Sequence, residues 1–208
     1  MITVPGAGRV TGTPDTVRVR VTATALRATS AEALAAAEAT AADVRAALER
    51  HGVTGAAAAS GVFSLAAEQA WTESGPRVTG YRCDHEIRVV LRDVAGVGRV
   101  LADVLAAGGD GVRVDGVEPG LEDDAALRVR ARELAWADAL DRATRLAALA
   151  GRELGPVAAV AEGSGHPPIG VPLVKTVLMG MPPGSGDVSV RPGDVEVVVA
   201  LTVQWELS

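Results

Sequence analysis

The amino-acid sequence predicts a compact α+β protein that contains a ferredoxin-like βαββαβ portion. Some segments alternate apolar and polar residues, as half-buried strands do, and others repeat apolar residues every three or four positions, as helices do. Between residues 16 and 117 these segments follow the order strand, helix, strand, strand, helix, strand, which is the split βαβ arrangement. At 208 residues the chain can bury roughly 70% of its unfolded surface, so a real core is expected.

The first elements are two strands and a helix. Residues 2–10 and 16–26 are strand candidates on either side of a Gly-Thr-Pro-Asp turn sequence. Thr29 and Glu32 form a capping box that starts the helix, and Gly52 ends it. The apolar residues expected on one face of this helix are Leu34, Ala37, Ala41, Val44 and Leu48.

The middle of the chain completes the βαββαβ order. Its predicted segments are a weaker strand at residues 56–65, a loop at 66–79, a strand at 80–92, a helix that Asp93 caps and that stops at Gly108-Gly109, and a short strand at 112–117. The strand at 80–92 shows the clearest alternation in this half of the chain. It therefore anchors the predicted sheet.

The second half begins with a long helix at about 122–150, whose opening acidic run Glu122-Asp123-Asp124 suits a helix N-terminus. Small residues recur on it every four positions, at Ala131, Ala135, Ala139, Ala143, Ala147 and Gly151. Such a seam lets another element approach closely. The remaining segments are a strand at 155–162, a stretch rich in Gly and Pro at 163–193, and a final strand at 194–207.

The stretch from 163 to 191 is predicted to build a subunit interface. Structureless loops longer than about 12 to 15 residues are usually functional or disordered, and this one is too apolar for disorder. Its candidate interface residues are Ile169, Val171, Leu173, Val174, Val177, Leu178, Met179 and Met181. The alternative is that these side chains fold back onto the protein's own sheet.

Composition excludes several classes of protein. The formal net charge is −6 with the charges mixed along the chain, and aromatic residues make up only 2%, so we expect no nucleic-acid partner. No stretch approaches the roughly 20 apolar residues that span a bilayer, so no membrane insertion is expected. The N-terminus lacks the pattern of a signal peptide, which indicates a cytoplasmic protein as the sequence is written.

Few residues are candidates for a chemical site. Cys83 and His85 lie two apart on one strand and share a face, but apolar residues share it too, and no further Cys or clustered His completes a zinc site. We therefore expect Cys83 to lie in the core, with no thiol chemistry there. Glu122-Asp123-Asp124 is explained by helix capping as well as by a cation.

Nucleophilic and phosphate-binding motifs are also poorly supported. Ser164 and Ser185 lie in Gly-Ser-Gly contexts rather than in a nucleophile elbow, and neither His51 nor His166 neighbours a candidate nucleophile. The glycine-rich run at residues 6–12 is followed by a strand instead of a helix, so we expect a turn or bulge there and no phosphate cradle. The sequence offers no catalytic, cofactor-binding or metal-binding residues.

Several short motifs, taken in order, resemble the SIMPL-domain family, which includes YggE-like oxidative-stress-defence proteins and periplasmic immunogenic proteins. They are Val4-Pro5-Gly6-Ala7-Gly8 with Pro14-Asp15, Gly80-Tyr81, the Ala-rich helix at 132–151, Leu154-Gly155-Pro156-Val157 with Glu162, and Arg191-Pro192-Gly193. The resemblance covers nearly the whole chain, which makes residues 1–208 a single domain with a ferredoxin-like portion at 16–117 and the remainder at 118–208.

The resemblance implies a second sheet, formed by the N- and C-terminal strands beside the long Ala-rich helix. It also implies homo-oligomers in some members and a role in stress tolerance or protein interaction, with no catalytic residues to carry over. Many members have a signal peptide, so a periplasmic or extracellular location applies if this chain is a trimmed mature form.

Three functions follow from these observations. The first is a non-enzymatic oligomeric interaction or scaffold protein, linked to stress response, whose partner is itself or another protein. The second is a protein that binds a small molecule or metal in a cleft between the sheets, and the third is an enzyme. We expect the first, without a cofactor, because it explains why the sequence shows no clustered chemistry.

Overall fold

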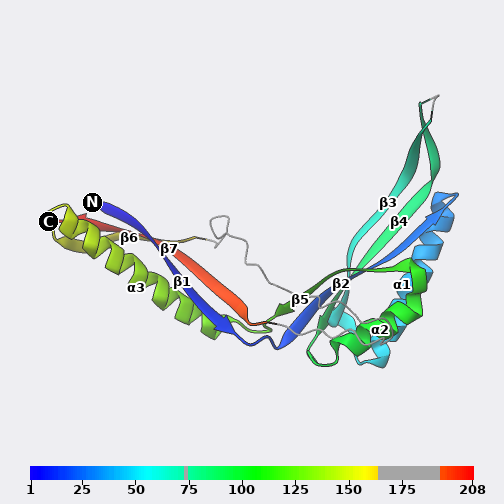
Figure 1. Cartoon of the computed structure of the whole chain (residues 1–208), viewed down its shortest axis with the longest axis horizontal. Coiled ribbons are helices and arrows are strands. Elements are labelled where there is room, and N and C mark those ends of the chain that lie inside the picture. Colours follow the sequence, from blue (N-terminus) through cyan, green and yellow to red (C-terminus); the bar gives the residue numbers. More distant parts are fainter. Residues whose placement is uncertain (73–74, 164–192) are drawn as a thin grey trace, which may run out of the picture. The chain divides into compact units, whose positions relative to one another are not determined.

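The computed structural model describes residues 1–72, 75–163 and 193–208, and these residues form three helices and two antiparallel sheets (Figure 1). They fall into two compact units. The terminal unit contains Met1–Pro14, 121–163 and Gly193–Ser208, and the central unit contains Asp15–Gly120. The predicted α+β class is confirmed.

The central unit has the ferredoxin-like topology that the order of elements predicts. Its elements are β2 (Thr16–Arg27), α1 (Ser30–Arg50), β3 (Ala58–Thr72), β4 (Gly75–Leu91), α2 (Val97–Gly108) and β5 (Val112–Gly120), with short 3-10 turns at Gly55–Ala57 and Gly109–Gly111. The strands lie in the order β3-β4-β2-β5, and every neighbouring pair is antiparallel. This strand order is what a split βαβ module requires.

Both helices of the central unit pack on one face of its sheet (Figure 1). The capping box of α1 forms as predicted, with Thr29 and Glu32 each accepting the other's backbone N–H. Leu34, predicted to face the core, is instead 39% exposed, and Ala33 is buried in its place. The buried stripe passes through residues 33, 37, 41 and 44, and residue 34 lies at its edge, about 70° around the helix from its middle.

The second helix begins later than its acidic cap suggests. Asp93 accepts the backbone N–H of Gly96 at 3.0 Å, so it closes the turn before α2 rather than capping the helix itself. The predicted stop at Gly108-Gly109 is confirmed, since Gly109 has a φ of +52° and follows the last helical residue.

Strands β3 and β4 form a long hairpin that extends beyond the end of α1 (Figure 1). The loop predicted at residues 66–79 is therefore wrong, because Ala66 pairs with Arg82 and Thr72 with Gly75. Nearly all side chains of β3 are exposed. A strand that is solvated on both faces shows no apolar alternation, so the sequence pattern cannot reveal it.

The terminal unit is the second sheet that the resemblance implies, covered by one helix. It consists of β1 (Ile2–Gly12), α3 (Ala125–Leu149), β6 (Leu154–Gly163) and β7 (Val195–Leu207), with the strands in the order β1-β7-β6. Ile2 lies opposite Trp205, so the two ends of the chain meet on neighbouring strands of this sheet.

Helix α3 and strand β1 pack closely through their smallest residues. A Cβ atom added to Gly8 would overlap the carbonyl oxygen of Ala131 and lie 2.6 Å from the backbone nitrogen of Ala135. A Cβ atom added to Gly6 would overlap the carbonyl oxygen of Ala135 and lie 2.7 Å from the backbone nitrogen of Ala139. The predicted turn or bulge at these glycines is wrong: they lie within a strand, where the absence of a side chain lets the helix backbone approach. The predicted alanine seam is confirmed.

Candidate functional site

Helix α3 buries its smallest side chains and exposes its largest. All five seam alanines of α3, from Ala131 to Ala147, are at most 1% exposed. The large apolar residues of α3 that are exposed are Val129, Leu134, Trp136, Leu140, Leu146 and Leu149. A helix whose only partner is its own sheet should bury such residues first.

Some of these residues form one apolar surface with β6. A cleft of about 450 Å³ is lined mainly by Val129, Trp136, Val160, Leu201 and the stems of charged side chains. Val157 continues this surface along β6, because it and Val160 pair with Trp205 and Val203, which share a face. We call Val129, Trp136, Val157 and Val160 the α3–β6 patch.

An ion pair borders the α3–β6 patch. Arg132 donates from Nε and Nη2 to the two carboxylate oxygens of Glu162, at 2.8 and 2.9 Å. The hydrogen bonds from Arg132 hold the pKa of Glu162 below its ordinary value. Both residues are exposed, so the pair contributes little to stability and mainly fixes two charges at the edge of the apolar surface.

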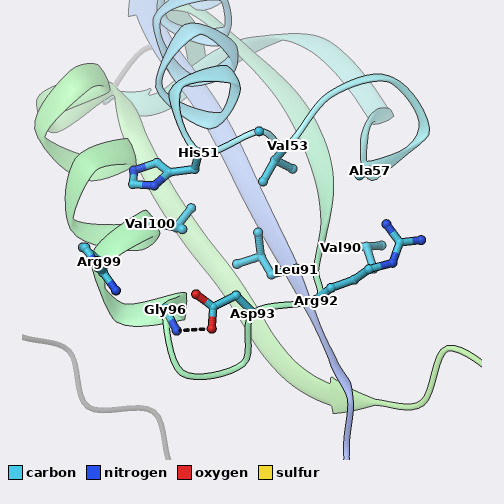
Figure 2. A pocket seen from close by; sticks show the side chains of 11 residues that line it. His51, Val53, Ala57, Val90, Leu91, Arg92, Asp93, Gly96, Arg99 and Val100 are labelled. Atoms are coloured by element: carbon cyan, nitrogen blue, oxygen red, sulfur yellow. Dashed lines mark hydrogen bonds between the residues drawn. The ribbon is translucent and has the colours of Figure 1, made fainter.

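A second cleft, of about 340 Å³, lies in the central unit between the end of α1 and the start of α2 (Figure 2). Its lining includes His51, Asp93, Arg92 and Arg99 (Figure 2). His51 Nε2 lies 2.7 Å from Asp103 Oδ2, which fixes the imidazole at the C-terminus of α1. The cleft thus combines two guanidinium groups and a histidine with the carboxylate of Asp93.

The sequence-predicted core position of Cys83 is confirmed. Its side chain is fully buried, and burial, followed by the charges of Glu38 and Asp84, raises the pKa of its thiol. His85 on the same face is 8% exposed, but it is not simply a core residue: it contacts polar side chains from α1 and β3. The sequence pattern does not reveal this cluster, because its members are far apart along the chain.

The remaining predicted candidates divide into two groups. Asp123 accepts the backbone N–H of Ala125 and Asp124 pairs with Arg128, so the acidic run serves the start of α3. Ser164, Ser185, His166 and the predicted interface residues between Ile169 and Met181 lie outside the described residues. Within residues 1–72, 75–163 and 193–208, no group of three or more His, Cys, Asp or Glu side chains could hold a metal ion.

Comparison with known proteins identifies one family. A family model described as "SIMPL: Protein of unknown function (DUF541)" matches residues 2–205. No curated protein matches the chain. In the part of the chain that the structure describes, no helix is long and apolar enough to cross a membrane.

Proposed function

Since the chain belongs to the SIMPL family, whose function is unknown, we propose that it works by assembling with copies of itself through the α3–β6 patch. The observation that carries this proposal is the inverted burial of α3, in which alanines face the sheet and larger apolar side chains face outward. Val129 and Val160 are 53% and 52% exposed within one cleft. Apolar surface of this kind commonly marks association sites.

A second copy is the occupant that the chemistry of the patch favours. Its edge carries both signs of charge, in the pairs Arg132 with Glu162 and Arg130 with Glu133. In a two-fold arrangement each copy presents the same patch to the other. Because the edge of the patch carries both signs of charge, an acidic group of one copy can meet a basic group of the other. A strongly basic or acidic partner would not match this balance.

The experiment is sedimentation velocity over a wide concentration range, comparing the parent with the double variant Val129→Asp/Val160→Asp. The parent is expected to associate and the double variant to sediment as a monomer, because buried unpaired carboxylates are costly. The control Val62→Asp/Val78→Asp changes two valines on the β3–β4 hairpin that are also exposed, at 68% and 46%, and it should associate like the parent. A monomeric parent would contradict the proposal.

The segment predicted from sequence as an interface is tested separately. Replacing residues 167–182 with a short Gly/Ser linker should weaken assembly if that segment also contacts a second copy. If this variant assembles like the parent while the Val129/Val160 variant does not, the α3–β6 patch is sufficient.

The proposed assembly also has the stress-related role that the family resemblance implies. A strain lacking this protein should be more sensitive to peroxide, and the parent should restore its growth. Complementation by the Val129→Asp/Val160→Asp variant should fail if assembly is required for the role. Equal growth of all strains under every stress tested would remove this part of the proposal.

A second candidate function, binding of a small anionic molecule, is favoured by the cleft beside His51, which Arg92 and Arg99 line. Native mass spectrometry of the purified protein reads oligomer size and retained ligand together. A retained anion that is lost in Arg99→Ala, with the oligomer unchanged, would support this candidate.

A further inference from the structure

His85 joins a carboxylate to a hydroxyl group through its two ring nitrogens. Its Nδ1 lies 2.7 Å from Oε1 of Glu38 on α1, and its Nε2 lies 3.3 Å from Oγ of Ser60 on β3. The imidazole is 8% exposed, while Ser60 is exposed at the edge strand of the sheet. The three residues are far apart in sequence and are brought together by the packing of α1 on the β3–β4 hairpin.

The carboxylate of Glu38 determines which ring nitrogen carries the proton. An ionised carboxylate only accepts hydrogen bonds, so Nδ1 of a neutral His85 must be the N–H donor. Nε2 is then unprotonated and can accept the hydroxyl proton of Ser60. This sequence of carboxylate, imidazole and hydroxyl is the arrangement that activates serine as a nucleophile.

We propose that Ser60 is a nucleophile that accepts the acyl group of carboxylic esters, with His85 as its general base and Glu38 as the residue that positions the imidazole. This activity goes beyond self-assembly and does not depend on it. It is also at odds with the expectation from sequence that the chain is not an enzyme, which rested on finding no clustered chemistry.

Arg45 supplies a positive charge at the same point. Its Nη2 donates to Ser60 Oγ at 3.2 Å and lies 3.3 Å from Nε2 of His85. Negative charge develops on the serine oxygen and then on the carbonyl oxygen during attack, and a guanidinium group beside them stabilises it. Arg45 and Glu38 both lie on α1, so one side of this helix provides both charged groups of the site.

The surroundings of Ser60 favour esters with a short apolar acyl chain. The next two residues of β3, Gly61 and Val62, have no partner in β4, so the strand bulges beside the hydroxyl. Phe63 and Leu65 pair with His85 and Cys83 and share their face, yet both are exposed. The Phe63 ring meets the His85 ring edge-on, with centroids 5.9 Å apart. An acyl chain would therefore contact apolar side chains next to the nucleophile.

The reaction uses only the ester and water. Ser60 Oγ bonds to the carbonyl carbon while its proton moves to His85 Nε2. The bond from carbon to the alcohol oxygen then breaks, and His85 returns the proton to the departing alcohol. Water attacks the acyl-serine by the same two steps, which releases the carboxylic acid and restores Ser60.

The test is covalent labelling of the full-length protein with a fluorophosphonate, read by intact mass and peptide mapping. Ser60 attacks phosphorus, fluoride departs, and the hydroxyl proton is released to solvent through His85. One label per chain on Ser60 is expected, together with hydrolysis of p-nitrophenyl butyrate. Ser60→Ala should lose the label and lower the hydrolysis rate by about 100-fold.

The matched control is Ser64→Ala, an exposed serine on the same strand whose register partner is Asp84 rather than a residue of the cluster. It should label and hydrolyse like the parent. Absence of labelling, or labelling spread equally over several serines, would overturn the proposal. Sedimentation of Ser60→Ala should match the parent, so failure of this inference is distinguishable from failure of self-assembly.

The role of Glu38 has its own readout. The ¹⁵N chemical shifts of His85 should show the Nδ1–H tautomer in the parent and a shift toward the Nε2–H tautomer in Glu38→Ala. Labelling of Ser60 should slow by about tenfold or more in that variant. If both the tautomer and the labelling rate were unchanged, Glu38 would have no positioning role and the relay would be disproved.

Discussion

The two units each cover one face of an antiparallel sheet with helix, but they distribute side-chain size in opposite ways. In the central unit large residues meet in the middle: α1 and α2 contribute Val44, Leu48 and Leu101, and the sheet contributes Ile87 and valines. In the terminal unit the buried helix residues are all alanines and β1 contributes Val4 and glycines, while most of the bulk comes from β7 through residues such as Trp205.

In the terminal unit, close approach of two backbones occurs together with large side chains that point outward. A helix that lies against Gly6 and Gly8 has no room for leucine on its inner face. Its larger residues are therefore displaced outward, where they are available to another molecule. The central unit packs large residues between its helices and its sheet, and it leaves charged pairs on the other sheet face, such as Arg20 with Glu118 and Arg113 with Asp115. Several of its exposed large apolar residues, Phe63 among them, lie on the β3–β4 hairpin.

The largest effect is expected for Gly8→Ala. The added methyl group would overlap backbone atoms of α3, which cannot move aside as a side chain can, so we expect a loss of about 3 kcal/mol in the stability of the terminal unit. Denaturant unfolding followed by tryptophan fluorescence, which changes as the buried Trp205 is exposed, measures it. Ala7→Val, on the exposed face of the same strand, should change stability by less than about 0.5 kcal/mol.

A smaller effect is expected on the helix side of the same contact. Ala139→Leu inserts three carbons into a fully buried position and should cost about 1 to 3 kcal/mol. Ala137→Leu makes the same change at an exposed position of α3 and should be close to neutral. Equal unfolding midpoints for the two variants would show that the seam is not tightly packed.

In the central unit the sensitive change is loss of volume. Ile87→Val removes one buried methylene and should cost about 0.5 to 1.5 kcal/mol, whereas Val62→Ala at an exposed site should cost almost nothing. Thermal unfolding of both variants, followed by circular dichroism, makes the comparison. A neutral Ile87→Val would mean that this core is loosely packed.

Chemical reactivity should follow burial in the same unit. Cys83 is fully buried, and its thiol pKa is raised, so the thiolate that reacts with reagents is scarce in the folded protein. Titration with a thiol reagent should label Cys83 only after denaturant is added. Rapid stoichiometric labelling of the native protein would contradict the packing described for β4.

The smallest effect concerns the charged face of the central sheet. Burial raises the pKa of Asp115, but hydrogen bonds from Thr22 and Arg113 outweigh it and hold the pKa below its ordinary value. A lowered folded-state pKa stabilises the protein above the ordinary pKa, and this contribution is lost as the pH falls through the folded value. Unfolding at pH 7 and near pH 3 should therefore show a smaller acid-induced loss for Asp115→Asn than for the parent.

Local patterns in the sequence predicted much of the fold. The capping box at Thr29 and Glu32, the stop at Gly109 and the alanine seam each depend on neighbours within one helix, and all are confirmed. The order of motifs also led to the correct family.

The features that the sequence pattern does not predict depend on contacts between distant segments. The strand at residues 66–72 is held by backbone pairing while its side chains stay exposed, so it leaves no apolar pattern. The glycines of β1 are explained only by a helix more than 100 residues away, since Ala131 is their neighbour. Glu38 and Ser60 lie 47 and 25 residues from His85, and no motif links them.

The most direct test of the central claim, that the outward face of α3 meets a second copy, is site-specific photo-crosslinking. Benzoylphenylalanine is placed at Val129, light and ¹⁵N-labelled chains are mixed, and the crosslinked peptides are identified by mass. Crosslinks between light and heavy chains that map to α3 or β6 are expected, and none from a control at the exposed Ala46 of α1. Crosslinks confined within single chains, or equal crosslinking from position 46, would contradict it.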